Sequence, residues 1–470
     1  MDVKRKYSRR TGLKAGAAVM GGMFLGRLGT SASFAGEVLG TCSGNSTMGL
    51  RSAARADSLV DIMGVRTTLY ASATAYGNVP LVLNAVRDDA KGLGIRHLRE
   101  AIILPSVNAT MASKQRAAWP QFAALGIDFT SVIGDPDDSD GTVAAYASYI
   151  KEYLGGNSGL VSTVENSNEP NDTSSPWNKT NPDGWIPLVR ARQQQMATVF
   201  RNDPALNRIK LAGPTITGGA GIAKYQQLGD LSPNIDLGNF HYYSGNRKLS
   251  TPAAELDDIL MGLSVNAPGK SVICTETGMH QANYATSPMA PTPEDVAGVY
   301  MPRVALEHYF RGINRVFEFE LFDDVANPSF SDQEAHFGLL RYNTKTLDKK
   351  PAYLSLKRLL DLLREPGASF EPEGLYMQVT GAPDDYRQIL FEKSDGRRYL
   401  CMWRDVSIWD QVLNKPINVP IETLTLTLST PADIKLYRPS KQVLPDATYE
   451  GVTTLDIALV GSVIVLEISH

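Results

Sequence analysis

From Asp57 onward, short apolar and β-branched runs alternate with longer stretches in which apolar residues recur at helical spacing. Such alternation predicts strand–helix units and a parallel sheet. Eight runs predict strands: Met63–Leu69, Ile95–Arg99, Ile127–Ile133, Val161–Glu165, Ile209–Pro214, Ile235–Tyr242, Ser271–Thr275 and Val316–Phe322. Helices are predicted between many of them, over Pro80–Leu93, Thr142–Leu154, Pro187–Arg201, Ala253–Leu263 and Pro293–Tyr309.

Eight units within residues 57–368 favour an α/β fold of the (β/α)8 TIM-barrel type, which holds eight parallel strands in roughly 200 to 400 residues. A doubly wound open sheet is the alternative. No Gly-x-Gly-x-x-Gly turn follows the first predicted strand, and the strand count favours closure.

The pattern changes near Leu375, where apolar residues begin to alternate with polar ones and helical spacing stops. Five runs predict strands, Tyr386–Glu392, Arg398–Trp403, Thr423–Leu428, Ile434–Tyr437 and Val463–Ile468, with a turn at Ser394-Asp395-Gly396 between the first two. Short strands without helices predict a C-terminal all-β sandwich over residues 369–470. Residues 36–56 are predicted to be a linker before the barrel.

The N-terminus carries the features of an export signal. A basic start, Lys4-Arg5-Lys6, precedes an uncharged run from Ala15 to Gly26 and a small-residue region that ends Ser33-Phe34-Ala35. Ser8-Arg9-Arg10-Thr11-Gly12-Leu13-Lys14 resembles the twin-arginine export motif, although Gly12 replaces the usual Phe. We therefore expect residues 1–35 to be a signal read by the twin-arginine export machinery, with no stable membrane insertion after processing and a periplasmic or extracellular location.

Charge and cysteine content narrow the function classes. The 470 residues include 46 basic and 50 acidic side chains, a near-neutral balance that argues against a nucleic-acid binder. Residues 1–35 hold seven basic residues and one acidic residue, so the remainder carries a formal net charge of −10. That charge gives no help in binding anionic polymers. Three cysteines are too few for a disulfide scaffold or a Cys-based zinc site, and Cys274 and Cys401 are predicted to be buried.

Polar side chains at strand ends are the candidate chemistry, because barrel active sites lie at the C-terminal ends of the strands. Arg99 ends the second run, Glu169 follows the fourth, and Glu276 ends the seventh. Two glutamates on nonadjacent strands could face each other, as glycoside hydrolysis requires: one protonates the leaving oxygen while the other attacks the anomeric carbon or activates water. A carboxyl separation of about 5 Å means retention of configuration and roughly 6.5–9.5 Å means inversion.

Several motifs, taken in order, resemble those of the clan A retaining glycoside hydrolases, in particular the cellulase-like members. They are Asn168-Glu169-Pro170-Asn171 after the fourth strand, His241-x-Tyr243 after the sixth, Thr275-Glu276-Thr277-Gly278 on the seventh, and Phe319-Glu320-Leu321-Phe322-Asp323 on the eighth. The resemblance implies that Glu169 is the general acid/base and Glu276 the nucleophile. It also implies that Asn168 binds the sugar 2-hydroxyl, that Tyr243 contacts the nucleophile and that Arg99 supports it. No metal or organic cofactor is implied. Arg66-Thr67 on the first strand and Phe319 on the eighth depart from the family pattern, where His and Trp are common.

For several other candidate residues the sequence leaves two roles open. Trp177 and Trp185 could stack on sugar rings or anchor the loop that carries them. Glu320 could bind sugar hydroxyls or brace a loop, whereas Glu165 is predicted to be a buried structural carboxylate. The substrate is expected to be an oligo- or polysaccharide. A non-catalytic carbohydrate-binding barrel, a metal-dependent barrel hydrolase and a transglycosylase that uses the same residues remain alternatives.

Overall fold

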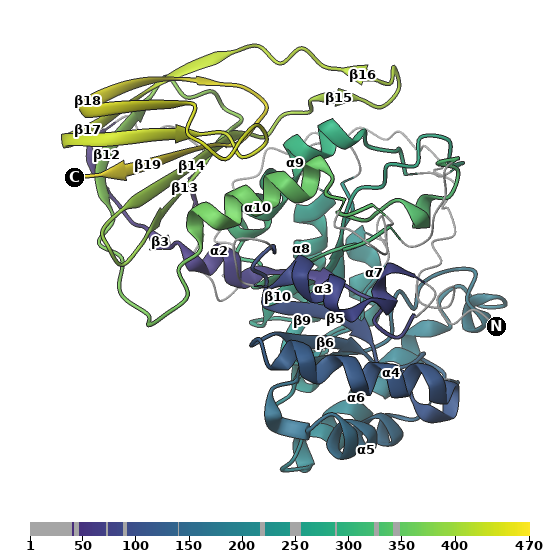
Figure 1. The fold of residues 1–470 in the computed structure, drawn as a ribbon. Helices are drawn as coiled ribbons and strands as arrows, with labels where there is room; N and C mark the ends of the chain where they lie inside the picture. The colour runs from purple at the N-terminus through teal and green to yellow at the C-terminus, as the bar shows by residue number, and fades with distance from the viewer. Residues whose placement is uncertain are drawn as a thin grey trace.

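The computed structural model describes residues 40–41, 47–71, 74–87, 92–139, 141–216, 221–244, 255–286, 289–323, 329–341 and 348–470 (Figure 1). The predicted export signal at residues 1–35 and Cys42 lie outside the described residues.

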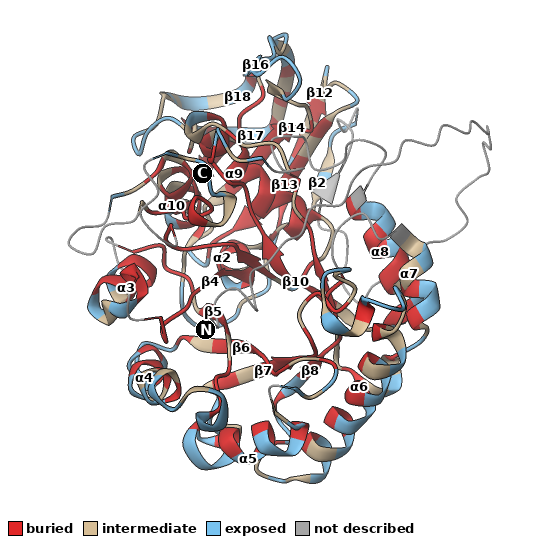
Figure 2. Ribbon diagram, turned by 90° about the vertical axis from the view of Figure 1, so that its right-hand side faces the viewer, coloured by how far each residue is buried: buried red, intermediate tan, exposed pale blue. Residues whose placement is uncertain are grey.

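Eight parallel strands form a closed barrel, as predicted. In sequence order they are β4 (Met63–Arg66), β5 (His97–Ala101), β6 (Asp128–Val132), β7 (Val161–Glu165), β8 (Lys210–Ala212), β9 (Leu237–His241), β10 (Ser271–Thr277) and β11 (Arg315–Glu318). The barrel closes where β11 pairs with β4, Glu318 opposite Val65. The strands are buried along most of their length, with the helices around them (Figure 2). This burial is the reason that apolar and β-branched residues are frequent in these runs.

The five predicted helices are present as α3 (Val79–Val86), α5 (Val143–Tyr153), α6 (Trp185–Asn202), α8 (Glu255–Asn266) and α9 (Glu294–Phe310). Four more were not predicted: α2 (Asp57–Ile62), α4 (Pro105–Ala123), α7 (Gly221–Leu228) and α10 (Pro351–Leu363). In α4 the buried stripe begins with Ala112, Gln115 and Ala118 and only then reaches Trp119 and Phe122, so large apolar residues mark the helical period only near the end of the helix. In the part of the chain that the structure describes, no helix is long and apolar enough to cross a bilayer.

The C-terminal region is all-β, as predicted. It consists of β12 (Leu375–Thr380), β13 (Tyr386–Glu392), β14 (Arg398–Arg404), β17 (Glu422–Tyr437), β18 (Ala447–Leu459) and β19 (Ile464–Ser469), with a small ribbon of β15 (Trp409–Asp410) and β16 (Lys415–Pro416). Strand β17 changes partners along its length. Its first half pairs with β12 and its second half with β19, and the register shifts near Pro431. The sheet thereby bends around an apolar core that includes Met377, Leu426 and Leu466, so a single continuous sheet stands where the sequence predicted a sandwich of two.

The segment predicted to be a linker is partly incorporated into this sheet, which corrects the prediction for residues 36–56. Strand β2 (Gly49–Arg51) pairs with β12, and β1 (Gly40–Thr41) and β3 (Ala54–Arg55) pair with β13. These strands cover edges that would otherwise expose unpaired backbone groups. They are too short to show a period in the sequence, and the chain therefore enters the barrel only after contributing to the C-terminal sheet.

One face of the C-terminal sheet packs into the core of the barrel, and the other face has an apolar core of its own. Strand β14 alternates: Leu400 and Met402 face the core inside the bent sheet, whereas Cys401 and Trp403 face the barrel helices. The Trp403 ring lies edge-on to Phe310 at 6.2 Å between centroids, and its Nε1 donates to Glu307 Oε1 at 2.6 Å. Burial of both cysteines that the structure describes matches the sequence analysis.

Replacing Trp403 with alanine will lower the free energy of unfolding by about 3–5 kcal/mol, because it leaves a cavity between the two parts of the chain. Trp403→Phe is the matched control: it keeps an aromatic ring and removes the hydrogen bond to Glu307, which also interacts with Arg311. It should cost about 1–2 kcal/mol. Urea denaturation followed by tryptophan fluorescence measures both. Equal effects of the two changes would contradict this role of the interface.

Candidate active site

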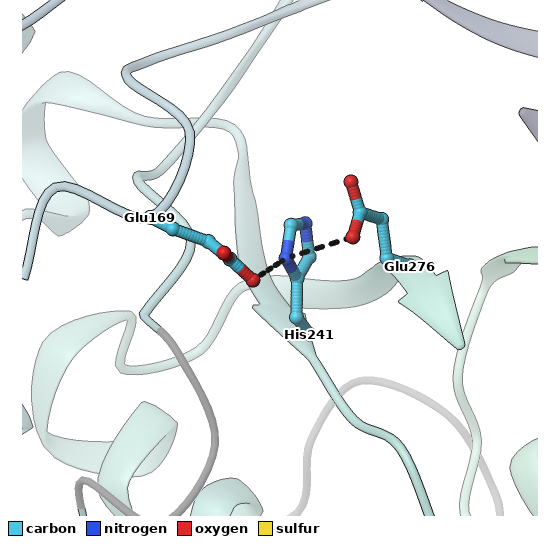
Figure 3. Close-up of side chains that lie close together, drawn as sticks. All are labelled: Glu169, His241 and Glu276. Atoms are coloured by element: carbon cyan, nitrogen blue, oxygen red, sulfur yellow. Dashed lines mark hydrogen bonds and ion pairs between the residues drawn. The ribbon is translucent and has the colours of Figure 1, made fainter. Parts of the chain in front are cut away.

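Two buried glutamates meet at the C-terminal ends of nonadjacent strands. Glu169 lies four residues after β7, Glu276 lies within β10, and they are 7% and 5% exposed. His241, the last residue of β9, lies between them (Figure 3). One ligand atom from each of the three residues lies within 4.8 Å of the others, so the two carboxylates and the imidazole form one cluster.

His241 contacts both carboxylates through one nitrogen. Its Nδ1 lies 2.8 Å from Glu169 Oε1 and 3.5 Å from Glu276 Oε2. The other nitrogen, Nε2, is buried and has no hydrogen-bond partner among the described residues. A proton on Nδ1 therefore serves whichever of the two carboxylates is ionised.

Glu276 receives a strong hydrogen bond on each oxygen. Arg99 Nη1 donates to Oε1 and the Tyr243 hydroxyl donates to Oε2, both at 2.6 Å. Charge-assisted bonds of this kind favour the ionised carboxylate. The structure therefore brings Arg99 and Tyr243 to Glu276, as the resemblance implies, and adds His241, which the sequence analysis selected without placing it at Glu276.

Arg99 connects Glu276 to a second carboxylate below it in the barrel. Arg99 Nε and Nη2 donate to the oxygens of Glu165 at 2.7 and 3.2 Å, and Nη2 also donates to Asn168 Oδ1 at 2.8 Å. Burial by itself would lower the pKa of Arg99, but the two carboxylates outweigh it and raise the pKa above its ordinary value. Arg99 is therefore a fixed cation, and Glu165 is the structural carboxylate that the sequence indicated.

The network continues across the barrel to the strand that carries Glu276. Asn239 Nδ2 donates to Glu165 Oε2 at 3.1 Å, and Thr275 Oγ1 donates to Asn239 Oδ1 at 2.9 Å. Strands β5, β7, β9 and β10 each supply one side chain or more. The position of Arg99 is thereby determined by several strands at once, which limits its movement during a reaction.

The backbone at Glu169 lies in the left-handed region, with φ at +46°. A non-glycine residue there costs on the order of 1–3 kcal/mol and occurs often at functional sites. The loop is held by its neighbours: Glu169 N donates to Thr215 Oγ1 at 3.1 Å, and Trp177 Nε1 and Asn178 Nδ2 donate to the Pro170 carbonyl at 2.7 and 2.8 Å. The half-buried Trp177 thus has the anchoring contacts that were one of its two predicted roles.

Trp185 is not available to substrate, which corrects its assignment as a sugar-binding residue. Its side chain is 0% exposed at the first position of α6 and belongs to the barrel core. The polar residues around it in the sequence suggested a loop, whereas the structure begins a helix there.

Glu320 braces the first strand from inside the protein. Its carboxylate is buried, forms an ion pair with Arg66, and accepts a hydrogen bond from Tyr76 Oη at 3.0 Å. The Arg66 guanidinium lies over the Phe319 ring at 4.9 Å. These contacts favour the bracing role for Glu320. They also identify Arg66 as a site residue that the sequence analysis mentioned only as a departure from the family pattern. The first strand was predicted to run to Leu69, so Arg66 did not stand at its predicted end, whereas in the structure β4 ends at Arg66, opposite Arg99 of β5.

Glu100, next to Arg99, is a buried carboxyl that the sequence analysis did not select. It accepts hydrogen bonds from Trp119 Nε1 at 3.1 Å, from Tyr70 N at 3.3 Å and from Thr67 Oγ1 at 3.3 Å. Burial raises the pKa of the Glu100 carboxyl to about 7, although these donors and Arg66 act in the opposite direction.

This raised pKa predicts a pH dependence of stability. Because the folded state holds the Glu100 proton more tightly than the unfolded chain does, its contribution is full below about pH 4.5 and is lost as the pH rises through about 7. In Glu100→Gln that loss is absent, so the unfolding free energy of the variant relative to wild type should rise by up to about 3 kcal/mol between pH 4.5 and 8. Denaturant titrations at the two pH values measure it, with exposed Glu152→Gln as the control. A pH-independent difference would contradict the assignment.

Glu169, His241 and Glu276 are also the residues that could hold a metal ion, since each offers a ligand atom. The donor set is not well suited to one. The ligand oxygens of Glu276 already accept from Arg99 and Tyr243. A fixed guanidinium beside the site opposes a second cation. The arrangement instead suits two carboxyl groups of unlike role, one held ionised and one in contact with a histidine.

No family model and no curated protein matches the chain. Solved structures do. A family 39 glycoside hydrolase from Bacteroides cellulosilyticus WH2 is 16% identical, with a TM-score of 0.58 over 89% of this chain and 83% of the other. A bifunctional glucanase-xylanase from a metagenome library is 11% identical, with a TM-score of 0.53 over 91% of this chain and 98% of the other. A family 51 α-L-arabinofuranosidase from Bifidobacterium longum is 11% identical, with a TM-score of 0.51 over 91% and 98%. At these identities the likeness shows a shared fold: the chain is folded like these barrel glycoside hydrolases.

Proposed function

We propose that the chain is an exported retaining glycoside hydrolase that cleaves O-glycosidic bonds of an oligo- or polysaccharide by double displacement. The observation that carries this proposal is the distance between the carboxylates. One oxygen of Glu169 lies within 4.8 Å of one oxygen of Glu276, which agrees better with the roughly 5–5.5 Å between the carboxyl groups of retaining enzymes than with the roughly 6.5–9.5 Å of inverting ones. The short separation supports direct attack by one carboxylate.

The contacts of the two glutamates support unlike roles. Glu276, ionised and oriented by Arg99 and Tyr243, attacks the anomeric carbon and forms a glycosyl ester. Glu169 enters this step as the acid and transfers its proton to the departing oxygen. It then deprotonates the water that attacks the ester, which releases the sugar with its original configuration.

His241 supports the exchange of charge between the two steps. Before the first step the anion is Glu276; in the glycosyl ester the anion is Glu169. Because Nδ1 lies 2.8 and 3.5 Å from these two carboxylates, a proton on it stabilises each anion in turn without large movement. The same histidine proton therefore stabilises the anion of both half-reactions, which a cation close to only one of the carboxylates would not do.

The test is the configuration of the first-formed product. Glycosides and plant, fungal and bacterial wall polysaccharides are screened for turnover, and proton NMR then follows the anomeric signal before mutarotation. We expect the product to keep the configuration of the substrate. An inverted product would overturn the mechanism, and binding without turnover in the whole panel would favour a carbohydrate-binding barrel. Added sugar acceptors distinguish hydrolysis from transglycosylation by their products.

The convergence of two carboxylates and a histidine leaves a metal-dependent hydrolase as the second candidate. The engagement of Glu276 by Arg99 argues for independence from metal. Dialysis against EDTA should therefore leave kcat/KM unchanged. Loss of activity that zinc or manganese restores would favour the second candidate.

Residues 1–35 support export, and the charge of −10 on the remainder supports a neutral glycan as substrate. We assign the C-terminal sheet the role of stabilising the barrel through the Trp403 interface. Fractionation of cells that express the full chain, with Arg9 and Arg10 changed to lysine as the control, tests the export route.

A further inference from the structure

A small cavity lies near the carboxylate pair. It is lined by residues from the C-terminal ends of β4 and β5 and from the segment that follows β7. Its volume is about 20 Å³, and its lining includes Arg66, Thr67, Arg99, Glu100 and Asn168. One of its lining residues, Arg99, donates to Glu276, and another, Asn168, directly precedes Glu169 in the chain. Its ligand would therefore belong to the sugar on which the carboxylates act, so the assignment of that ligand rests on the proposed function.

Arg66 presents hydrogen-bond donors in this cavity. Its Nη1 forms the ion pair with Glu320, and its guanidinium is held over the Phe319 ring. Among the described residues, Nε and Nη2 of Arg66 make no hydrogen bond, and neither does Asn168 Nδ2. The carboxylate of Glu100 already accepts from Trp119, Tyr70 and Thr67. The cavity thus offers donors in excess of acceptors and suits an acceptor oxygen.

The volume limits the ligand to about one oxygen atom. A cavity holds a water molecule when its volume exceeds roughly 10–15 Å³. A hydroxyl group fits in 20 Å³, whereas an acetamido or a sulfate group has several more heavy atoms and requires Arg66 or Glu100 to move.

Charge argues against a carboxylate as the ligand. The positive charge of Arg66 is compensated by Glu320, and that of Arg99 by Glu165 and Glu276. A further anion would lie in a buried site with no uncompensated cation and beside the carboxyl of Glu100. Burying an unpaired charge is far more costly than burying a hydroxyl that accepts hydrogen bonds.

We propose that Arg66 binds one hydroxyl of the sugar residue that occupies the carboxylate pair, and that its cavity restricts the substrate to neutral sugars with a free hydroxyl at that position. Arg66 is a specificity-determining residue in this assignment, and Glu320, Tyr76 and Phe319 hold it in place.

The experiment compares the hydrolysed glycoside with analogues that each lack one hydroxyl. In wild type, loss of the hydroxyl bound by Arg66 should lower kcat/KM on the order of 10- to 100-fold, as expected for a hydrogen bond to a charged group. The test variant combines Arg66→Met with Glu320→Gln, so that no buried carboxylate is left unpaired; in it the same deoxygenation should cost less than about threefold. Glu320→Gln alone is the matched control and keeps the full penalty.

A penalty that is equal in wild type and in the double variant, for every hydroxyl, would overturn the assignment. So would a uronic acid or 2-acetamido glycoside that wild type hydrolyses faster than the unsubstituted sugar. Failure of the proposed function gives a different result, namely no turnover of any glycoside by wild type. In that case dissociation constants of the same glycosides and deoxy analogues, measured by calorimetry on the same variants, decide whether Arg66 binds the hydroxyl.

Discussion

Glu276→Gln is expected to lower kcat/KM by about 10⁴-fold or more on every substrate, because the amide cannot form the glycosyl ester. Glutamine keeps the size of the side chain, so Tyr243 can still donate to its carbonyl oxygen. Arg99 would lose its charge partner there but keep Glu165, so the fold should persist. Steady-state kinetics with an aryl glycoside, together with circular dichroism, measure both effects.

Azide provides the sharper test. In Glu276→Ala the small anion can enter the space left by the carboxylate and attack from the face that Glu276 uses. The product should then be a glycosyl azide with configuration opposite to that of the substrate. Glu152→Gln, on the exposed side of α5, is the control and should behave as wild type. Full activity in Glu276→Gln would remove the nucleophile from the mechanism.

Glu169→Ala should show an effect that depends on the leaving group. A glycoside whose leaving group needs a proton should lose on the order of 10²–10⁴-fold in rate, the usual contribution of a general acid. A dinitrophenyl glycoside leaves without a proton, so its first step should be nearly normal. Its second step should be slow because no base activates water. We therefore expect a rapid burst of dinitrophenol release followed by slow steady-state turnover.

The burst also distinguishes the roles of the two glutamates, because Glu276→Gln should show no burst. Azide added to Glu169→Ala should accelerate turnover and give a glycosyl azide of unchanged configuration, because it attacks the ester where water normally does. Equal losses on good and poor leaving groups would contradict the acid/base role of Glu169.

The hydrogen-bond network beneath the two glutamates explains why a single substitution need not disrupt the geometry of the site. Arg99 is held by Glu165, Glu165 by Asn239, and Asn239 by Thr275. Each member comes from a barrel strand that is paired on both sides. The nucleophile is therefore positioned by the barrel itself rather than by a loop.

The sequence by itself determined the barrel and the all-β region, and it indicated the candidate site residues. All eight barrel strands could be predicted because each falls in a short run in which apolar and β-branched residues are frequent, as burial in the barrel requires. Glu169 and Glu276 could be selected because barrel chemistry lies where such runs end. Helix α4 was not predicted, since small residues and a glutamine occupy most of its buried stripe before Trp119 and Phe122. Strands β2 and β3 could not be predicted either, because three and two residues show no period.

Only the tertiary structure decided the distances between the site residues and which of their side chains are exposed. The separation of the two carboxylates depends on how the strands are staggered around the barrel, and no local pattern encodes that stagger. Trp185 and Trp177 are alike in sequence, yet the first is inside the core and the second lies against the loop after Glu169. Arg66 and Glu320, 254 residues apart, pair because β11 closes the barrel onto β4. Local periodicity reports which face of an element is buried; which side chains meet is decided by closure of the whole barrel.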